Sequence, residues 1–239
     1  MKYFLLIGLG FYILSCSQSS EFNVKYYGAL KNIMKENDLS AHIHLSDFKN
    51  ENNFYALGAV ENLKGEILII DSKPFYIYRS NDKLGEEEID VKNTFDIGAA
   101  FAVTAQVNNW KEFSIPLSLK SKIDLEAFIL EKAKESKIDI NQPFPFMVEG
   151  LISSVSWHVI DWPENDDEHT HEKHLKNGYK ETSIYEKIKI LGFYSDSHQG
   201  VFTHHSSNTH MHVINDKGSK GGHVDDLVLG EEMILKLPK

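Results

Sequence analysis

The part of the sequence that decides the fold is the stretch 210–223, HMHVINDKGSKGGH, which predicts two β-strands joined by a glycine-rich turn. Side chains two residues apart in a strand point to the same face, so His210 and His212 share one face and Met211 takes the other. The turn folds the second strand back along the first and brings His223 beside the pair. We therefore expect Met211 to face the core while the three histidines face one cavity.

Three imidazoles that converge in this way are typical of a catalytic zinc site, which keeps a fourth position open for water or substrate. Structural zinc sites are usually closed by a fourth protein ligand, often cysteine, and the single cysteine of this chain is Cys16, far from the stretch. The spacing predicts that His210, His212 and His223 bind zinc, with copper, iron or nickel as alternatives for an imidazole set. The competing interpretation is an HxH pair that lies by chance on a solvated strand face.

The other histidines show weaker patterns. His42 and His44 form a second same-face pair, but no third ligand lies near them in sequence, which favours a structural role. Five more histidines precede the motif in polar segments, where they form either a second metal site or, as the favoured interpretation, solvated side chains. These are His169, His171, His174, His204 and His205.

Glu66 is the candidate for proton chemistry. No Ser-His-Asp or Cys-His pattern stands out in the sequence, so a carboxylate must supply any acid or base. Glu66 follows Gly65 in a turn that leads into an apolar strand, and a glutamate at the mouth of a buried strand often serves as a ligand or as an acid or base. A solvated turn glutamate is the equal alternative.

Hydrophobic periodicity predicts a mixed α+β fold in which strands dominate. The clearest helix is expected over 124–136, and a short amphipathic helix over 27–35. A polar, histidine-bearing loop is expected over 163–179, and the chain is expected to divide near residue 140. Strands are expected over 55–60, 66–70, 73–78, 99–107, 144–159, 188–194, 201–215 and 222–229.

The N-terminus predicts export. A positive start is followed by an apolar run of about 12 residues, which is too short to span a bilayer and suits a secretory signal. The run ends in residues 13–16, ILSC, which look like a bacterial lipobox. We expect residues 1–15 to be a signal peptide, 16–24 to be a tether, and Cys16 to carry lipid that anchors the protein to a bacterial membrane, in the periplasm or at the cell surface. An ordinary cleaved signal peptide is the alternative.

The charge of the chain bears on its partners. The formal net charge is −10, which argues against nucleic acid and against anionic lipid as ligands, because either would require a basic patch. The plain explanation of the charge is solubility. Any membrane contact is therefore expected only through a lipid at Cys16.

Several motifs together resemble a known family. The stretch 210–226, with ten residues between its second and third histidines, resembles the zinc-binding segment of bacterial α-acetolactate decarboxylases. The segment 58–66, GAVENLKGE, is similar to the glutamate turn of that family. The segments 144–159 and 191–194 are similar to two further family segments and come in the same order. The resemblance covers most of residues 40–229.

The resemblance implies a fold, a reaction and residue roles. The fold is α+β and strand-rich, with two sheet-containing halves, here 25–140 and a metal-binding half 141–239. The reaction is zinc-dependent decarboxylation of 2-acetolactate, a small 2-hydroxy-3-keto acid, to acetoin and CO₂. Residues carried over from the motifs are Glu66, as a ligand or proton relay, and the zinc ligands His210, His212 and His223.

The chain also departs from the family pattern. His158 falls where the family has a catalytic arginine. It is expected to act as a weaker substrate contact, because imidazole cannot bind a carboxylate through two parallel hydrogen bonds as guanidinium does. Ala59 replaces a threonine, and the segment 163–179 is an insertion. The family places a further functional glutamate after the third histidine, where this chain offers Glu231 and Glu232.

These departures predict a divergent member of the family. They leave open a different metal-assisted lyase or hydrolase on the same scaffold, and also a non-catalytic surface protein that binds metal or a small acid. A homodimer is one candidate for the oligomeric state, which the sequence leaves undecided.

Overall fold

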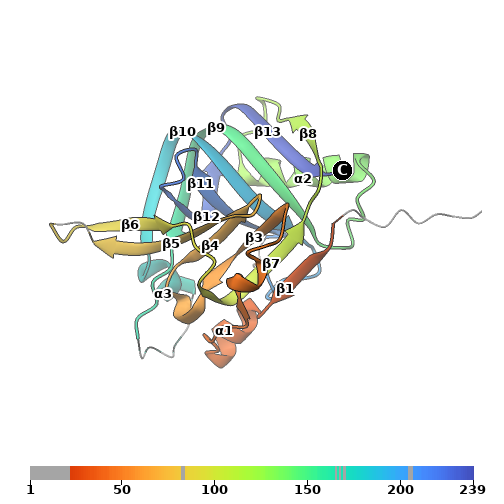
Figure 1. The fold of residues 1–239 in the computed structure, drawn as a ribbon. Coiled ribbons are helices and arrows are strands. Elements are labelled where there is room, and N and C mark those ends of the chain that lie inside the picture. Colours follow the sequence, from red (N-terminus) through yellow and green to blue (C-terminus); the bar gives the residue numbers. More distant parts are fainter. Residues whose placement is uncertain (1–21, 82–83, 165, 167, 169–170, 204–206) are drawn as a thin grey trace, which may run out of the picture.

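The structure is a computed structural model that describes residues 22–81, 84–164, 166, 168, 171–203 and 207–239. Two antiparallel sheets dominate it (Figure 1). The first sheet has the strand order β1-β7-β3-β4-β5-β6, and β2 pairs with β7. Its strands are β1 (Val24–Tyr27), β2 (Ile43–His44), β3 (Phe54–Val60), β4 (Glu66–Ile70), β5 (Lys73–Asn81), β6 (Glu87–Lys92) and β7 (Gly98–Gln106).

The second sheet has the strand order β10-β11-β12-β9-β13-β8. Strands β9 and β10 also pair with each other along their whole length, so β10, β11, β12 and β9 close into a ring of four strands. A ring of this kind leaves no open edge between its members. The strands are β8 (Trp110–Ser114), β9 (Phe144–Val159), β10 (Tyr179–Tyr194), β11 (Thr209–Asn215), β12 (Gly221–Val228) and β13 (Glu231–Pro238).

Helices are few among the described residues. The longest begins with a capping box, in which the Ser121 hydroxyl accepts a hydrogen bond from the Asp124 amide and the Asp124 carboxylate accepts one from the Ser121 amide. These reciprocal bonds satisfy two backbone donors that a helix start would otherwise leave unpaired. The helices are α1 (Leu30–Glu36), α2 (Lys122–Glu135) and α3 (His171–Lys176), with short 3-10 turns η1 (Leu45–Phe48) and η2 (Glu61–Leu63).

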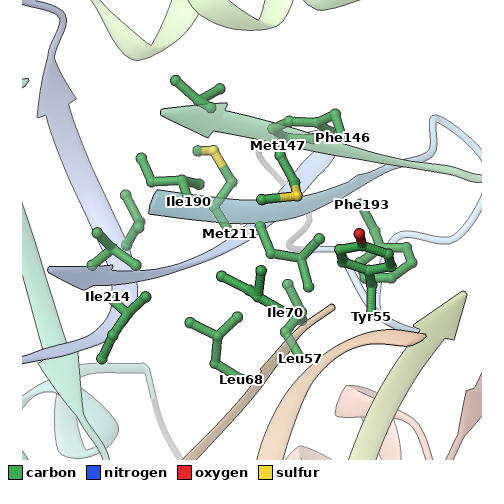
Figure 2. Close-up of a cluster of buried hydrophobic side chains, with 14 of the residues drawn as sticks. Tyr55, Leu57, Leu68, Ile70, Phe146, Met147, Ile190, Phe193, Met211 and Ile214 are labelled. Carbon is green, nitrogen blue, oxygen red and sulfur yellow. The ribbon is translucent and has the colours of Figure 1, made fainter. Parts of the chain in front are cut away.

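The main core lies between the two sheets. Figure 2 shows Leu68 and Ile70 of the first sheet on the side of β11 that carries Ile214, while Met211 points toward Met147 and Ile190 within the second sheet. Because side chains alternate along a strand, Glu66 shares the face of β4 that carries Leu68 and Ile70. The alternation therefore directs the Glu66 side chain toward the second sheet.

The predicted fold class is confirmed: the protein is α+β and strand-rich, with two sheet-containing halves. The expected core position of Met211 is also found, with the side chain 2% exposed. Strand β8 joins the second sheet by pairing with β13, although it precedes residue 140. The division of the chain near residue 140 as a domain boundary stays a prediction.

Three expected elements differ in the structure. Helix α3 lies inside the segment 163–179 that was expected to be a loop. Strand β10 begins at Tyr179 instead of residue 188, because its polar first half is held by pairing with β9. The strand expected to begin at residue 201 begins at Thr209. Within the part of the chain that the structure describes, no helix has the length and apolar character that crossing a membrane requires.

Candidate metal centre

The three histidines of the 210–223 stretch meet in the structure. Strands β11 and β12 form the expected hairpin, and His212 stands opposite His223 in their register. Gly222 allows the close pairing with β9, because a Cβ at this position would lie 2.2 Å from the His158 carbonyl oxygen. One ring nitrogen from each of His210, His212 and His223 lies within 4.8 Å of the other two. The residues described contain this one group of three that is suited to a metal ion.

Backbone carbonyls fix the tautomers of two of these rings. His210 Nδ1 lies 2.6 Å from the Phe202 carbonyl oxygen, and His212 Nδ1 lies 2.9 Å from the Ile67 carbonyl oxygen. A carbonyl oxygen only accepts hydrogen bonds, so both Nδ1 atoms carry the proton and both Nε2 atoms of the neutral rings carry a lone pair. Phe101 stacks on His210 with ring centroids 5.5 Å apart and further fixes that ring.

The lone pairs converge on one point. His210 Nε2 lies 3.2 Å from His212 Nε2 and 3.0 Å from His223 Nδ1. Complete burial lowers the pKa of His212 to about 3, so this ring is neutral at physiological pH. When both rings are neutral, the two Nε2 lone pairs face each other, and a cation bound between them stabilises this arrangement. Nitrogens that share a tetrahedral zinc ion stand about 3.3 Å apart, close to the spacing found.

Glu66 lies against this centre. One of its carboxyl oxygens, Oε2, is 3.5 Å from His212 Nε2, and the other, Oε1, accepts a hydrogen bond of 3.1 Å from the Ile160 amide. The side chain is buried, and that burial raises the pKa of Glu66 to about 7. A buried carboxyl group that titrates near neutral pH is suited to deliver or accept a proton.

His158 lies beside His223. It stands opposite His223 in the pairing of β9 with β12, and the two ring centroids are 4.9 Å apart. Its Nδ1 lies 2.8 Å from a carboxylate oxygen of Asp225. A β-bulge between Val224 and Asp226 makes Asp225 the extra residue of β12. Alternation places Asp225 on the same face as His223, which lies two residues before it. The contact could not be predicted because the sequence does not show that β9 pairs with β12 and brings His158 to this place.

These residues line a cavity of about 660 Å³. Its wall includes Glu66, His158, His210 and His223, together with Ile33 and Met34 of α1. Helix α1 is held in place because the Leu30 amide donates to the Val201 carbonyl at 2.9 Å. A mostly apolar wall with a few convergent polar groups is typical of a small-molecule site.

The remaining candidates lie away from the trio or outside the described residues. His42 Nε2 pairs with an Asp38 carboxylate oxygen at 3.0 Å, and His44 is exposed. Glu231 and Glu232 are exposed on β13 and are not part of the cavity wall. His171 and His174 belong to α3, and the structure does not describe their side chains. Cys16, His169, His204 and His205 lie outside the described residues altogether.

The comparison with protein families agrees with this geometry. The model of the family described as alpha-acetolactate decarboxylase matches residues 25–237. The chain belongs to the alpha-acetolactate decarboxylase family. No curated protein matches the chain significantly. This places the chain as a distant member of a carboxy-lyase family that acts on a small-molecule substrate.

Solved structures show that the family fold is kept. The acetolactate decarboxylase of Bacillus subtilis subspecies spizizenii is 17% identical, with a TM-score of 0.70, and the match covers 90% of this chain and 86% of that one. The enzyme of Bacillus subtilis strain 168 is 17% identical, with a TM-score of 0.68 and coverages of 90% and 85%. A Staphylococcus aureus protein of unknown function, described as similar to alpha-acetolactate decarboxylase, is 16% identical, with a TM-score of 0.66 and coverages of 89% and 84%.

Proposed function

We propose that this protein is a zinc-dependent decarboxylase that converts 2-acetolactate to acetoin and CO₂. The observation that carries the proposal is the pair of His210 and His212, whose Nδ1 atoms donate to backbone carbonyls and whose Nε2 atoms lie 3.2 Å apart. Hydrogen bonds from the other ring nitrogen to a carbonyl oxygen orient imidazoles for a metal ion and raise their basicity as ligands. Membership of the family supports the choice of reaction.

In this proposal His210, His212 and His223 hold the zinc ion. When bound, the ion supplies Lewis-acid chemistry at the keto and hydroxyl oxygens of the substrate. The departure of CO₂ leaves an electron pair on a carbon atom, and one proton must be added there to give acetoin. Glu66 is the group placed to deliver this proton, because its carboxyl group is buried beside the histidine centre, with one oxygen 3.5 Å from His212 Nε2.

A second candidate function comes from His158. Its Nδ1 is held 2.8 Å from a carboxylate oxygen of Asp225, and an imidazole oriented by a carboxylate can take a proton from water or substrate. This pair favours a different metal-assisted lyase or hydrolase on the same scaffold. A non-catalytic protein that binds metal or a small acid would have no need of such a pair.

The test uses the full chain carrying Cys16→Ser, loaded with zinc. We expect one zinc ion per chain by metal analysis and formation of acetoin from racemic 2-acetolactate, with activity lost on treatment with a chelator and restored by zinc. One zinc ion without acetoin would favour the second candidate. A chain that takes up no zinc would contradict both functions.

We also propose that the protein is exported and anchored through lipid on Cys16. The ILSC run and the apolar segment before it support this proposal, although they lie outside the described residues. Expressed in a bacterium, the wild-type chain is expected in the membrane fraction and to incorporate labelled fatty acid. Cys16→Ser is expected to lose the label. A wild-type chain that takes up no label would contradict lipid anchoring and leave ordinary secretion.

A further inference from the structure

Lys122 differs from the other cations of the cavity. Four lysines contribute to the wall, and three of them are exposed, namely Lys31, Lys35 and Lys180. Exposed ammonium groups keep their hydration and are screened by salt, so they contribute little to binding. Lys122, the first residue of α2, is half-buried and lines the cavity together with His210 and His223.

The ammonium group of Lys122 is held by the backbone. Its Nζ donates a hydrogen bond of 3.1 Å to the carbonyl oxygen of Asp225, two residues after His223. An ammonium group has three N–H donors, and this bond uses one of them. The contact directs the end of the side chain toward the strand that carries the third histidine.

No carboxylate contacts this ammonium within the described residues. The nearby acids act from a greater distance, and two of them are engaged elsewhere: an Asp225 oxygen lies 2.8 Å from His158 Nδ1, and a Glu126 oxygen accepts from Ser207. The third nearby acid is Asp226. Burial lowers the pKa of Lys122, which reflects the cost of holding a cation there. Because none of these three acids forms a close ion pair with Lys122, its ammonium group is available to an anionic ligand that enters the cavity.

We propose that Lys122 binds the carboxylate of the substrate. The inference rests on the proposed function, because it takes the ligand to be a small 2-hydroxy acid bound at the histidine centre. His158 is less suited to this role, since Asp225 already engages its Nδ1. Lys122 is then a specificity-determining residue, which favours acids over uncharged molecules of the same shape.

The test compares an acid with its uncharged amide. Binding of 2-hydroxy-2-methylpropanoate and of 2-hydroxy-2-methylpropanamide is measured by calorimetry on the Cys16→Ser chain, with zinc and after chelation. Wild type is expected to prefer the acid, and Lys122→Met is expected to weaken acid binding by about tenfold or more while amide binding stays within about twofold. Lys122→Arg is expected to restore most of the preference because it keeps the charge.

Lys134→Met, an exposed lysine on the same helix, is the matched control and is expected to bind both molecules as wild type does. Thermal unfolding and zinc content check that each variant is folded. The inference is overturned if Lys122→Met keeps the acid preference, if both ligands weaken equally, or if wild type does not prefer the acid. A wild-type chain that shows the preference but forms no acetoin would contradict the proposed function and leave the role of Lys122 standing.

Discussion

Replacement of His212 by alanine is expected to abolish stoichiometric zinc binding and to lower kcat/KM for acetoin formation by about 10³-fold or more, since Lewis-acid stabilisation contributes several kcal/mol. His212 is the most buried of the three histidines, and its ring joins the two sheets through the hydrogen bond from Nδ1 to the Ile67 carbonyl. Its removal takes away one ligand and also the bond that orients it. Metal analysis after dialysis, together with steady-state kinetics, measures both effects.

His44→Ala is the matched control for this prediction, because His44 is an exposed histidine on β2 and belongs to no group of potential ligands. It is expected to keep wild-type zinc content and activity. If His212→Ala is poorly folded, zinc content and activity are measured on His223→Ala, which changes a less buried ligand. Retention of one zinc ion per chain with wild-type affinity in both variants would exclude the proposed centre.

The hairpin of this centre could be predicted from sequence because its determinants are local. Alternation along β11 separates His210 and His212 from Met211, and a glycine-rich turn returns the chain so that His212 faces His223. The direction of Glu66 follows from the same rule, since Leu68 and Ile70 share its face of β4. What alternation could not predict is that this face meets β11 of the other sheet.

The parts that could not be predicted depend on irregular or distant contacts. Asp225 reaches His158 because β9 pairs with β12, and a single sequence does not show which distant strands pair. Lys122 lies about a hundred residues before the histidine stretch and appears in the sequence as an ordinary surface lysine at a helix start. The first half of β10 was missed because its charged residues conceal a strand that long-range pairing with β9 stabilises.

Glu66→Gln is expected to lower kcat for acetoin formation by about 100-fold or more while zinc content stays at the wild-type level. An amide has the shape of the carboxyl group and can still accept the hydrogen bond from the Ile160 amide, but it cannot deliver a proton. Glu231→Gln, at an exposed position outside the cavity, is the matched control and is expected to keep wild-type kcat. Wild-type kcat in Glu66→Gln would exclude Glu66 as the proton donor.

The same substitution has an expected effect on stability in the metal-free protein. Burial raises the pKa of Glu66 from 4.5 to about 7, so the folded state keeps a proton that the unfolded state loses as pH rises. The stabilising contribution of the protonated group is complete below pH 4.5 and is lost between pH 4.5 and 7, with a total of about 3 kcal/mol in the free energy of unfolding. Glutamine has no proton to lose in this range, so the free energy of unfolding of Glu66→Gln shows no such decline.

Urea unfolding in the presence of a chelator, from pH 4 to pH 8, measures this difference directly. Glu66→Gln is expected to match wild type near pH 4 and to exceed it by about 3 kcal/mol at pH 8, while titration of His212 affects both chains and cancels. A zinc ion beside the carboxylate favours its ionised form, so the advantage of glutamine is expected to disappear in the zinc-loaded proteins. If Glu66→Gln stays more stable than wild type by the same amount with zinc bound, the metal does not lie next to Glu66.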